Sequence, residues 1–247
     1  MPDTAAFEAS QPLNDAPLLA VSGLQAWYGE SHILHGMEFI VGEGEVVTLL
    51  GRNGAGKTTT MKSIMGILPK RKGSIVFDGV ETIRLPSRQI ARLGIGYVPE
   101  ERGIFSSLTV EENLNLPPRV KPGGLAVEQI FELFPNLKER LRSQGTKLSG
   151  GEQQMLAIGR ILRTGANFLL LDEPTEGLAP VIIEQIGRTI ARLKQEGFTI
   201  ILVEQNFRFA QTVADRYYVV EHGRVVEMIP NTALEANMNK VHAYLGV

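Results

Sequence analysis

The stretch GRNGAGKTT at residues 51–59 restricts the possible fold of this chain more than any other segment. It follows the apolar run EVVTLL (45–50) and precedes a segment for which we predict a helix from Lys57 to Leu68. Glycines, a lysine and a threonine at this spacing, between a strand and a helix, match the phosphate-binding P-loop. The predicted phosphate-binding residues are Gly51, Arg52, Asn53, Gly54, Ala55, Gly56, Lys57, Thr58 and Thr59.

A loop of this type binds the phosphates of a nucleotide together with a magnesium ion. The glycines let backbone N–H groups wrap a polyphosphate, Lys57 neutralises the β and γ oxygens, and the Thr58 hydroxyl can ligate Mg²⁺. We therefore predict a nucleotide site at this loop.

Two adjacent carboxylates follow the apolar run of FLLLDEP. Asp172, at the end of the predicted strand, suits a contact to Mg²⁺ through water. Glu173 lies one residue farther out, where it can polarise the water that attacks the γ-phosphorus. Alone, the pair would also fit a solvated acidic turn, but its place behind a P-loop favours the catalytic interpretation.

The order of predicted elements indicates an α/β fold. EVVTLL, NFLLLD (167–172) and FTIILVE (198–204) are continuous apolar runs, typical of strands buried on both faces of a parallel sheet. Pro180 and Gly197 mark the two ends of a predicted helix. GSIVFDG alternates in polarity, and YYVVEHGRVVEM turns back at its His-Gly pair, so both are predicted to be antiparallel.

A different pattern occupies residues 101–148, where strand signals stop. Thr109 and Glu112 have the spacing of a capping box and start a predicted helical insert. A second capping box, Ser149 and Glu152, lies in KLSGGEQQM, where Ser-Gly-Gly opens into a helix. The exposed N–H groups of such a helix end attract anions, so the chain carries two predicted anion-binding elements.

Composition limits the remaining possibilities. A chain of 247 residues can form one α/β domain with its own core. A net charge of −2 with mixed signs argues against nucleic acid as a partner, and the absence of cysteine excludes disulfides and thiolate chemistry. The apolar runs are shorter than the roughly 20 residues of a membrane-spanning helix. Residues 1–17 are small, polar and proline-containing, so we predict a disordered extension.

GRNGAGKTT, LSGGEQQ and LLLDEP, in that order and with a helical insert between the first two, resemble the ABC-type ATPase family over residues 18–247. The resemblance implies a P-loop NTPase (RecA-like) parallel sheet with an N-terminal antiparallel β region and a helical subdomain at about 101–155. It also implies ATP and Mg²⁺ as cofactors and a head-to-tail dimer. In such a dimer the signature of one subunit caps the γ-phosphate bound by its partner; the matching residues are Ser149, Gly150, Gly151 and Glu152.

Three further positions correspond to family elements. Tyr28 matches the aromatic residue that stacks on adenine, although it also fits a half-buried strand aromatic. Glu100 replaces the usual glutamine before the insert, where its carboxylate could contact Mg²⁺. Gln205 replaces the usual histidine; its amide can donate a hydrogen bond to the γ-phosphate but cannot become cationic. With Glu173, it completes the predicted catalytic pair. The loop TEGLAP lacks the aspartate common in the dimer contact.

Other segments resemble particular groups of transporters within the family. VPEERGIF, LSGGEQQMLAIGR, DEPTEGLAP, LVEQN and AYLG resemble the smaller ATP-binding subunit of bacterial branched-chain amino-acid importers. YGESHIL, GRNG, DEPTEG and FRFAQTVADRYYVVEHG also resemble the ATPases of urea and short-amide importers. A soluble ATPase of iron–sulfur cluster assembly is a third alternative.

The importer resemblance implies a peripheral location and a set of partners. We expect the chain at the cytoplasmic face of the inner membrane, paired with a second ATPase subunit as a homodimer or heterodimer. Two membrane permeases would contact the ATPases, one through a short helix in the groove between core and insert. A periplasmic solute-binding protein would act indirectly.

Overall fold

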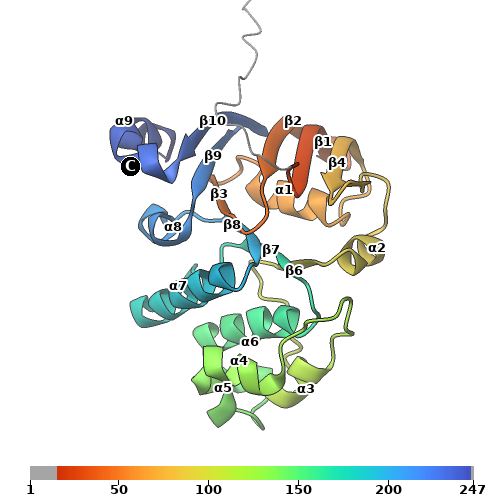
Figure 1. Cartoon of the computed structure of the whole chain (residues 1–247), viewed down its shortest axis with the longest axis vertical. Helices are drawn as coiled ribbons and strands as arrows, with labels where there is room; N and C mark the ends of the chain where they lie inside the picture. Colours follow the sequence, from red (N-terminus) through yellow and green to blue (C-terminus); the bar gives the residue numbers. More distant parts are fainter. Residues whose placement is uncertain (1–15, 246–247) are drawn as a thin grey trace, which may run out of the picture.

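A computed structural model describes residues 16–245 of the chain (Figure 1). Most of the predicted disordered extension, residues 1–15, lies outside the described residues, as do residues 246–247. The strands are β1 Leu19–Tyr28, β2 Ser31–Val41, β3 Val46–Leu50, β4 Arg71–Phe77, β5 Val80–Glu81, β6 Ile95–Val98, β7 Phe168–Asp172, β8 Thr199–Val203, β9 Arg216–Glu221 and β10 Arg224–Pro230. The helices are α1 Lys57–Ile64, α2 Ser87–Arg92, α3 Val110–Asn115, α4 Val127–Leu133, α5 Pro135–Glu139, α6 Gly150–Leu162, α7 Pro180–Gln195, α8 Phe207–Val213 and α9 Leu234–Leu245, with 3₁₀ turns at Gly145–Lys147 and Asn231–Ala233.

A six-stranded sheet in the order β10-β9-β3-β8-β7-β6 forms the core. Its strands run parallel from β9 to β6, and β10 is added antiparallel to β9. Every residue of β3, β7 and β8 is buried, which confirms the three strands predicted from continuous apolar runs. Parallel strands place their carboxyl ends at one edge of the sheet, so the segments after β3, β7 and β8 meet there.

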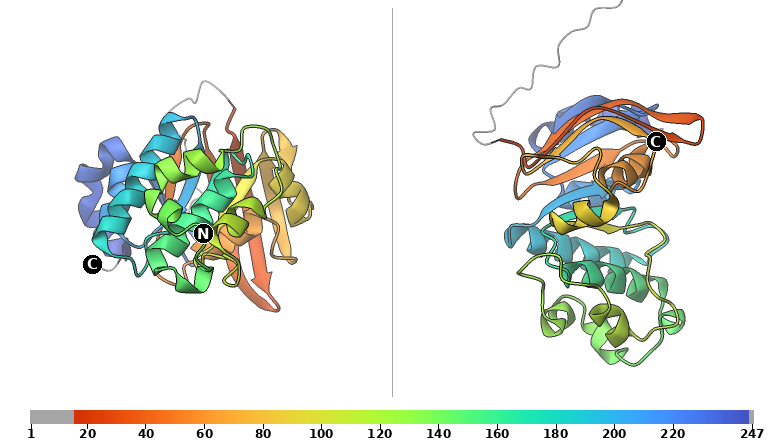
Figure 2. Two further views of the ribbon diagram at one scale, coloured as in Figure 1. Left: turned by 90° about the horizontal axis from the view of Figure 1, so that it is seen from below. Right: turned by 90° about the vertical axis from the view of Figure 1, so that its right-hand side faces the viewer.

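An antiparallel sheet in the order β2-β1-β4-β5 covers the core at the opposite end from the helical insert (Figures 1 and 2). The turn between β9 and β10 joins it to the core sheet: the His35 N–H of β2 donates a hydrogen bond of 2.9 Å to the Gly223 carbonyl. His222 and Gly223 both have positive φ, 45° and 70°, as a tight two-residue turn requires. Both antiparallel predictions are confirmed.

The helical part extends below the core sheet in Figure 1 and consists of α3, α4, α5 and most of α6. Its apolar residues form one cluster with the core strands, including Ile130, Phe134, Ile158 and Leu169. Both predicted capping boxes are present, at the start of α3 and of α6. Among the described residues, no helix combines the length and the apolar character needed to cross a bilayer.

The predicted end of α1 was wrong. The helix begins at Lys57 as expected but ends at Ile64 instead of Leu68. Gly66 follows with a φ of 68°, a left-handed conformation that ends a helix and favours glycine. A Cβ at Gly66 would lie 2.8 Å from the side chain of Ile90, a residue of α2. The close packing of α2 at this point therefore also favours glycine. By contrast, α7 has its predicted ends, with Pro180 in its first turn.

Candidate functional site

The P-loop lies between the end of β3 and the start of α1, and contacts from distant segments fix its path. Gly54 and Gly56 have φ values of 78° and 109°, which let the backbone turn tightly. Gly223, in the β9–β10 turn, donates its N–H to the Ala55 carbonyl at 2.8 Å. A Cβ on Gly56 would lie 2.7 Å from the Leu34 side chain. The loop is therefore held on one side by β2 and the turn, with its other side open.

Lys57, the first residue of α1, is buried beneath this loop. Its Nζ donates to the carbonyls of Gly51 at 2.7 Å and Arg52 at 3.1 Å. Burial lowers the pKa of the Lys57 ammonium, while the neighbouring carboxylates of Glu173 and Asp172 act in the opposite direction. A cation is thus held inside the curve of the loop.

Asp172 is fully buried at the end of β7, where two hydroxyl groups bind its carboxylate. Thr58 Oγ1 donates to Oδ1 at 3.0 Å, and the Tyr97 hydroxyl donates to Oδ2 at 3.0 Å. Burial raises the pKa of Asp172, and these two hydrogen bonds lower it. The sequence reasoning paired Thr58 and Asp172 correctly in space but missed Tyr97, which reaches the site from the adjacent strand β6.

Glu173 follows directly and has a φ of 47°, a conformation that few non-glycine residues adopt. Its N–H donates to the Val203 carbonyl at the end of β8, at 2.9 Å. The amide Nε2 of Gln205 donates to Glu173 Oε2 at 2.6 Å. Burial raises the pKa of Glu173 to about 7, against the opposing effects of the Gln205 hydrogen bond and the Lys57 charge. Such a carboxyl group changes charge near neutral pH, as a general base requires.

Glu100 and Glu176 lie beside Glu173, and one carboxylate oxygen from each of the three lies within 4.8 Å of the others. Burial raises the pKa of Glu100, with Glu176 adding to the effect through its charge and a shared hydrogen bond. Carboxylate oxygens are ligands that Mg²⁺ prefers, so this group could hold part of a metal coordination shell. Glu176 was missed from the sequence; the only available signal was its position three residues after Glu173.

These side chains enclose a cavity of about 380 Å³. Tyr28 stands at its edge, 44 % exposed, at the end of β1. Some predicted residues do not line it: Gly51 and Arg52 line an adjacent cavity, and Ala55 and Asp172 line neither of the two. The nucleotide-sized cavity is lined by Tyr28, Ile33, Asn53, Gly54, Gly56, Lys57, Thr58, Thr59, Glu100, Glu173, Glu176 and Gln205.

The signature segment does not line this cavity. It forms the start of α6: the Ser149 N–H donates to Glu152 Oε2 at 2.7 Å, and the Glu152 N–H donates to Ser149 Oγ at 3.3 Å. Gly150 and Gly151 occupy the first turn between them, where backbone N–H groups have no partner within the helix. A helix end of this kind can bind an anion, but not one held by its own P-loop in this conformation.

Known proteins resemble this chain in both sequence and fold. The sequence profile described as "ABC transporter" matches residues 34–176. The chain is 45 % identical, over 238 residues, to the high-affinity branched-chain amino acid transport ATP-binding protein BraG of Pseudomonas aeruginosa, covering 93 % of this chain and all of BraG. It is 34 % identical to the lipopolysaccharide export system ATP-binding protein LptB of Escherichia coli, covering 92 % of this chain and 97 % of LptB.

The fold is also that of solved structures. A nucleotide-free ATP-binding cassette from an ABC transporter superposes with a TM-score of 0.79 at 22 % identity, covering 94 % of this chain and 99 % of that chain. At that identity the likeness concerns the fold alone. Together with the profile match over more than half of the sequence, the full-length relatives decide the assignment: the chain belongs to the ABC transporter family.

Proposed function

We propose that this chain is the ATP-hydrolysing subunit of an importer of branched-chain amino acids. The chain has the ATPase domain of its family. The solute is inferred from the 45 % identity to BraG, which spans that whole protein, whereas identity to the lipopolysaccharide exporter subunit LptB is 34 %. The observation that carries the catalytic part is the meeting of Lys57, Glu173 and Gln205 in one cavity.

ATP fits this cavity through groups at both of its ends. The Tyr28 ring, exposed at the edge, would stack on adenine, and the glycine-rich backbone would wrap the phosphates. The Lys57 ammonium donates to the carbonyls of Gly51 and Arg52, which holds its charge inside the loop where phosphate oxygens would bind.

The oxygen atoms present also fit Mg²⁺. Thr58 Oγ1 and Asp172 Oδ1 are 3.0 Å apart. Glu100 lines the same cavity as Thr58, with its carboxylate near those of Glu173 and Glu176. Hard oxygen ligands of this kind are the ones that Mg²⁺ binds, with water filling the remaining positions. When bound, the ion would neutralise phosphate charge. We assign Thr58 directly, Asp172 through water and Glu100 as the third candidate ligand.

Hydrolysis follows from the position of Glu173. Its carboxylate orients a water molecule and accepts its proton as the water oxygen bonds to the γ-phosphorus. The bond from the γ-phosphorus to the bridging oxygen breaks, which leaves ADP and inorganic phosphate. Gln205 holds the carboxylate in place through its 2.6 Å hydrogen bond and is the second catalytic candidate.

The separation of the signature from the cavity supports a composite site between two ATPase subunits. Ser149, Gly150, Gly151 and Glu152 would face the γ-phosphate bound by the partner subunit, whether that subunit is a second copy or a related chain. We propose that the dimer binds two membrane permeases at the cytoplasmic face of the membrane, and that a periplasmic binding protein delivers the solute to them.

The proposal is tested in proteoliposomes that contain this chain together with the permease subunits of a branched-chain amino-acid importer. We expect leucine-loaded binding protein to stimulate ATP hydrolysis, and Glu173→Gln to abolish the stimulated rate. Stimulation by urea or a short amide instead would assign the chain to amide importers. ATP hydrolysis without binding to any permease would contradict a role in transport.

A further inference from the structure

A second cavity, of about 560 Å³, adjoins the nucleotide cavity and shares Asn53 and Gln205 with it. It lies between the start of the P-loop, the segment after β8 and the last turns of α9. Its volume falls within the range of about 300–1,000 Å³ that is typical of small-molecule sites. It is lined by Gly51, Arg52, Asn53, Gln205, Asn206, Phe207, Arg208, His242 and Leu245.

Among residues 16–245, the lining of this cavity contains two arginines and a histidine but no carboxylate. Within residues 16–245, neither Arg52 nor Arg208 takes part in an ion pair. Positive charges that share a cavity repel one another unless an anion lies between them. The side-chain amides of Asn53 and Asn206 add neutral N–H donors to the same walls. The chemistry of the lining is therefore that of an anion site.

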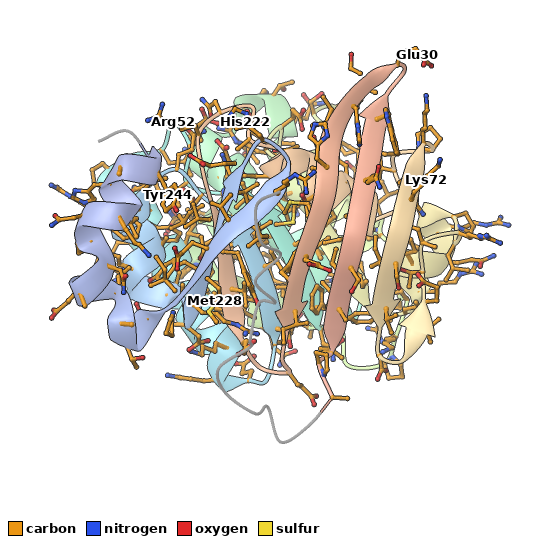
Figure 3. All side chains as sticks on the ribbon, turned by 90° about the horizontal axis from the view of Figure 1, so that it is seen from above. Glu30, Arg52, Lys72, His222, Met228 and Tyr244 are labelled. Atoms are coloured by element: carbon orange, nitrogen blue, oxygen red, sulfur yellow. The ribbon has the colours of Figure 1, made fainter. Side chains whose placement is uncertain are left out.

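The basic side chains are held by specific contacts. Arg52 Nε donates to the Tyr244 carbonyl near the end of α9 at 3.3 Å; Figure 3 labels both residues. Within the described part of the chain, its terminal N–H groups form no ion pair. The His242 ring meets the Phe207 ring edge-on, with centroids 6.3 Å apart. These contacts tie the P-loop and the segment after β8 to the same helix.

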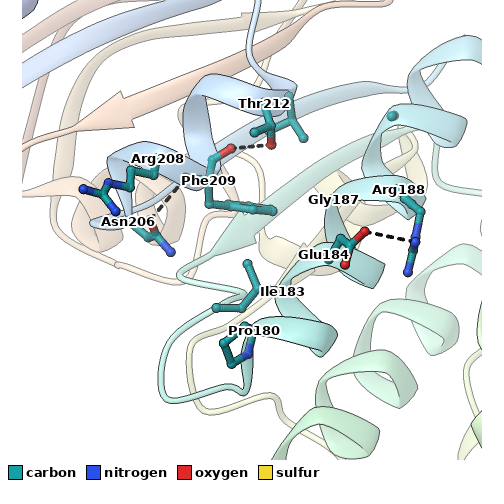
Figure 4. Close-up of a pocket in the computed structure, with 11 residues that line it drawn as sticks. Pro180, Ile183, Glu184, Gly187, Arg188, Asn206, Arg208, Phe209 and Thr212 are labelled. Atoms are coloured by element: carbon teal, nitrogen blue, oxygen red, sulfur yellow. Dashed lines mark hydrogen bonds and ion pairs between the residues drawn. The ribbon is translucent and has the colours of Figure 1, made fainter.

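Arg208 also borders a separate apolar groove of about 590 Å³ between α7 and α8. Figure 4 shows its guanidinium directed away from the α7 residues Ile183 and Glu184 across that groove. Its charged end therefore lies away from the apolar wall and remains available to the basic cavity, which Arg208 also lines.

We propose that the basic cavity binds a small oxyanion and that its natural occupant is the inorganic phosphate released in the nucleotide cavity. Gln205 stands between the two cavities, bonded to Glu173 on one side. A phosphate that leaves Glu173 past Gln205 enters the neighbouring cavity, whose walls carry Arg52 and Arg208. Guanidinium groups match phosphate oxygens with paired N–H donors. The identity of the occupant rests on ATP hydrolysis by this chain; oxyanion binding itself does not.

The first experiment measures the binding of inorganic phosphate to the full chain saturated with Mg²⁺ and a non-hydrolysable ATP analogue, by phosphorus NMR or calorimetry. The analogue fills the P-loop including the γ-phosphate position, so the remaining phosphate affinity reports on other sites. We expect Arg208→Gln and His242→Gln to weaken phosphate binding at least fivefold each. Arg188→Gln is the matched control, because Arg188 is an exposed arginine of α7 that pairs with Glu184 at 3.2 Å and lies outside the cavity. The control should bind phosphate like wild type.

The second experiment measures inhibition of ATP hydrolysis by added phosphate. Added phosphate should inhibit wild type even at saturating ATP. The inhibition constant for phosphate should rise at least fivefold in Arg208→Gln and stay unchanged in Arg188→Gln. If Lys57→Ala alone removes phosphate binding and the cavity variants do not, phosphate is held only by the P-loop and the proposal is overturned. If phosphate binds at the basic cavity but does not affect hydrolysis, the released phosphate is not its natural occupant. A chain that binds phosphate there yet hydrolyses no ATP would contradict the proposed function and leave oxyanion binding supported.

Discussion

Replacement of Gln205 by alanine tests how this residue acts, because the structure places its amide on the carboxylate of Glu173, our proposed general base. The 2.6 Å hydrogen bond from Nε2 to Glu173 Oε2 stabilises the ionised form of Glu173 and so opposes the effect of burial on its pKa. The expectation from sequence, a hydrogen bond to the γ-phosphate, stays a prediction. The two roles give different pH dependences.

The size of the effect follows from the hydrogen bond. A bond from a neutral amide to a carboxylate contributes about 1.5–3 kcal/mol. Because the Gln205 side chain is exposed to solvent, we take about 1.4 kcal/mol for this hydrogen bond. Its loss in the alanine variant should raise the pKa of Glu173 by about one. From a wild-type pKa of about 7, the ionised fraction at pH 7 falls from about a half to about a tenth. The variant should therefore lose about fivefold in kcat/KM at pH 7 and almost nothing at pH 9.

The assay is steady-state ATP hydrolysis by wild type and Gln205→Ala from pH 6 to pH 9, with the melting temperature of each protein recorded at every pH. An equal loss at all pH values would refute a role through Glu173 and favour a direct contact with phosphate. Normal turnover per folded molecule, with a lower melting temperature, would leave Gln205 with a structural role only.

Three further changes test separate parts of the site. Glu173→Gln should leave ATP affinity nearly intact and lower turnover at least about a hundredfold, measured by nucleotide binding and by phosphate release. Lys57→Ala and Ser149→Arg should each be inactive, whereas their equal mixture should recover up to about a quarter of the wild-type rate if the signature acts across the dimer. No recovery in dimers shown to exchange subunits would contradict independent composite sites. Gly223→Ala should raise the KM for ATP and lower the melting temperature, since its Cβ would lie 2.0 Å from a β2 carbonyl; Gly197→Ala, also at positive φ but with open space around it, is the control.

Lys57, Glu173 and Gln205 were predicted from the sequence to belong to one nucleotide site, and the structure brings them into one cavity. Continuous apolar runs placed β3, β7 and β8 in a parallel sheet, and the segments after such strands must meet at one edge. Lys57, Glu173 and Gln205 follow these strands directly or within a short loop, so their meeting was a consequence of the predicted topology.

Other contacts depend on strand order, which the sequence does not encode locally. Tyr97 bonds to Asp172 across 75 positions because β6 pairs with β7. Gly223 holds the P-loop at Ala55 because the β9–β10 turn lies over it. Neither contact has a signature in its own segment. The prediction of where α1 ends was wrong for a similar reason, because α2 packs at the place where the helix would have continued.

The charges around Glu173 explain how a carboxylate at position 100 is compatible with a phosphate site. Glu100, Glu173 and Glu176 line the nucleotide cavity together, and Lys57 is the one cation among the residues that line it. Burial and the neighbouring carboxylates raise the pKa of Glu100 and bring the pKa of Glu173 to about 7, so Glu173 is partly protonated at neutral pH. A neutral glutamine at position 100 would reduce that repulsion and lower the pKa of Glu173. The carboxylate at position 100 therefore helps to keep Glu173 titrating in the range where it can accept a proton from water.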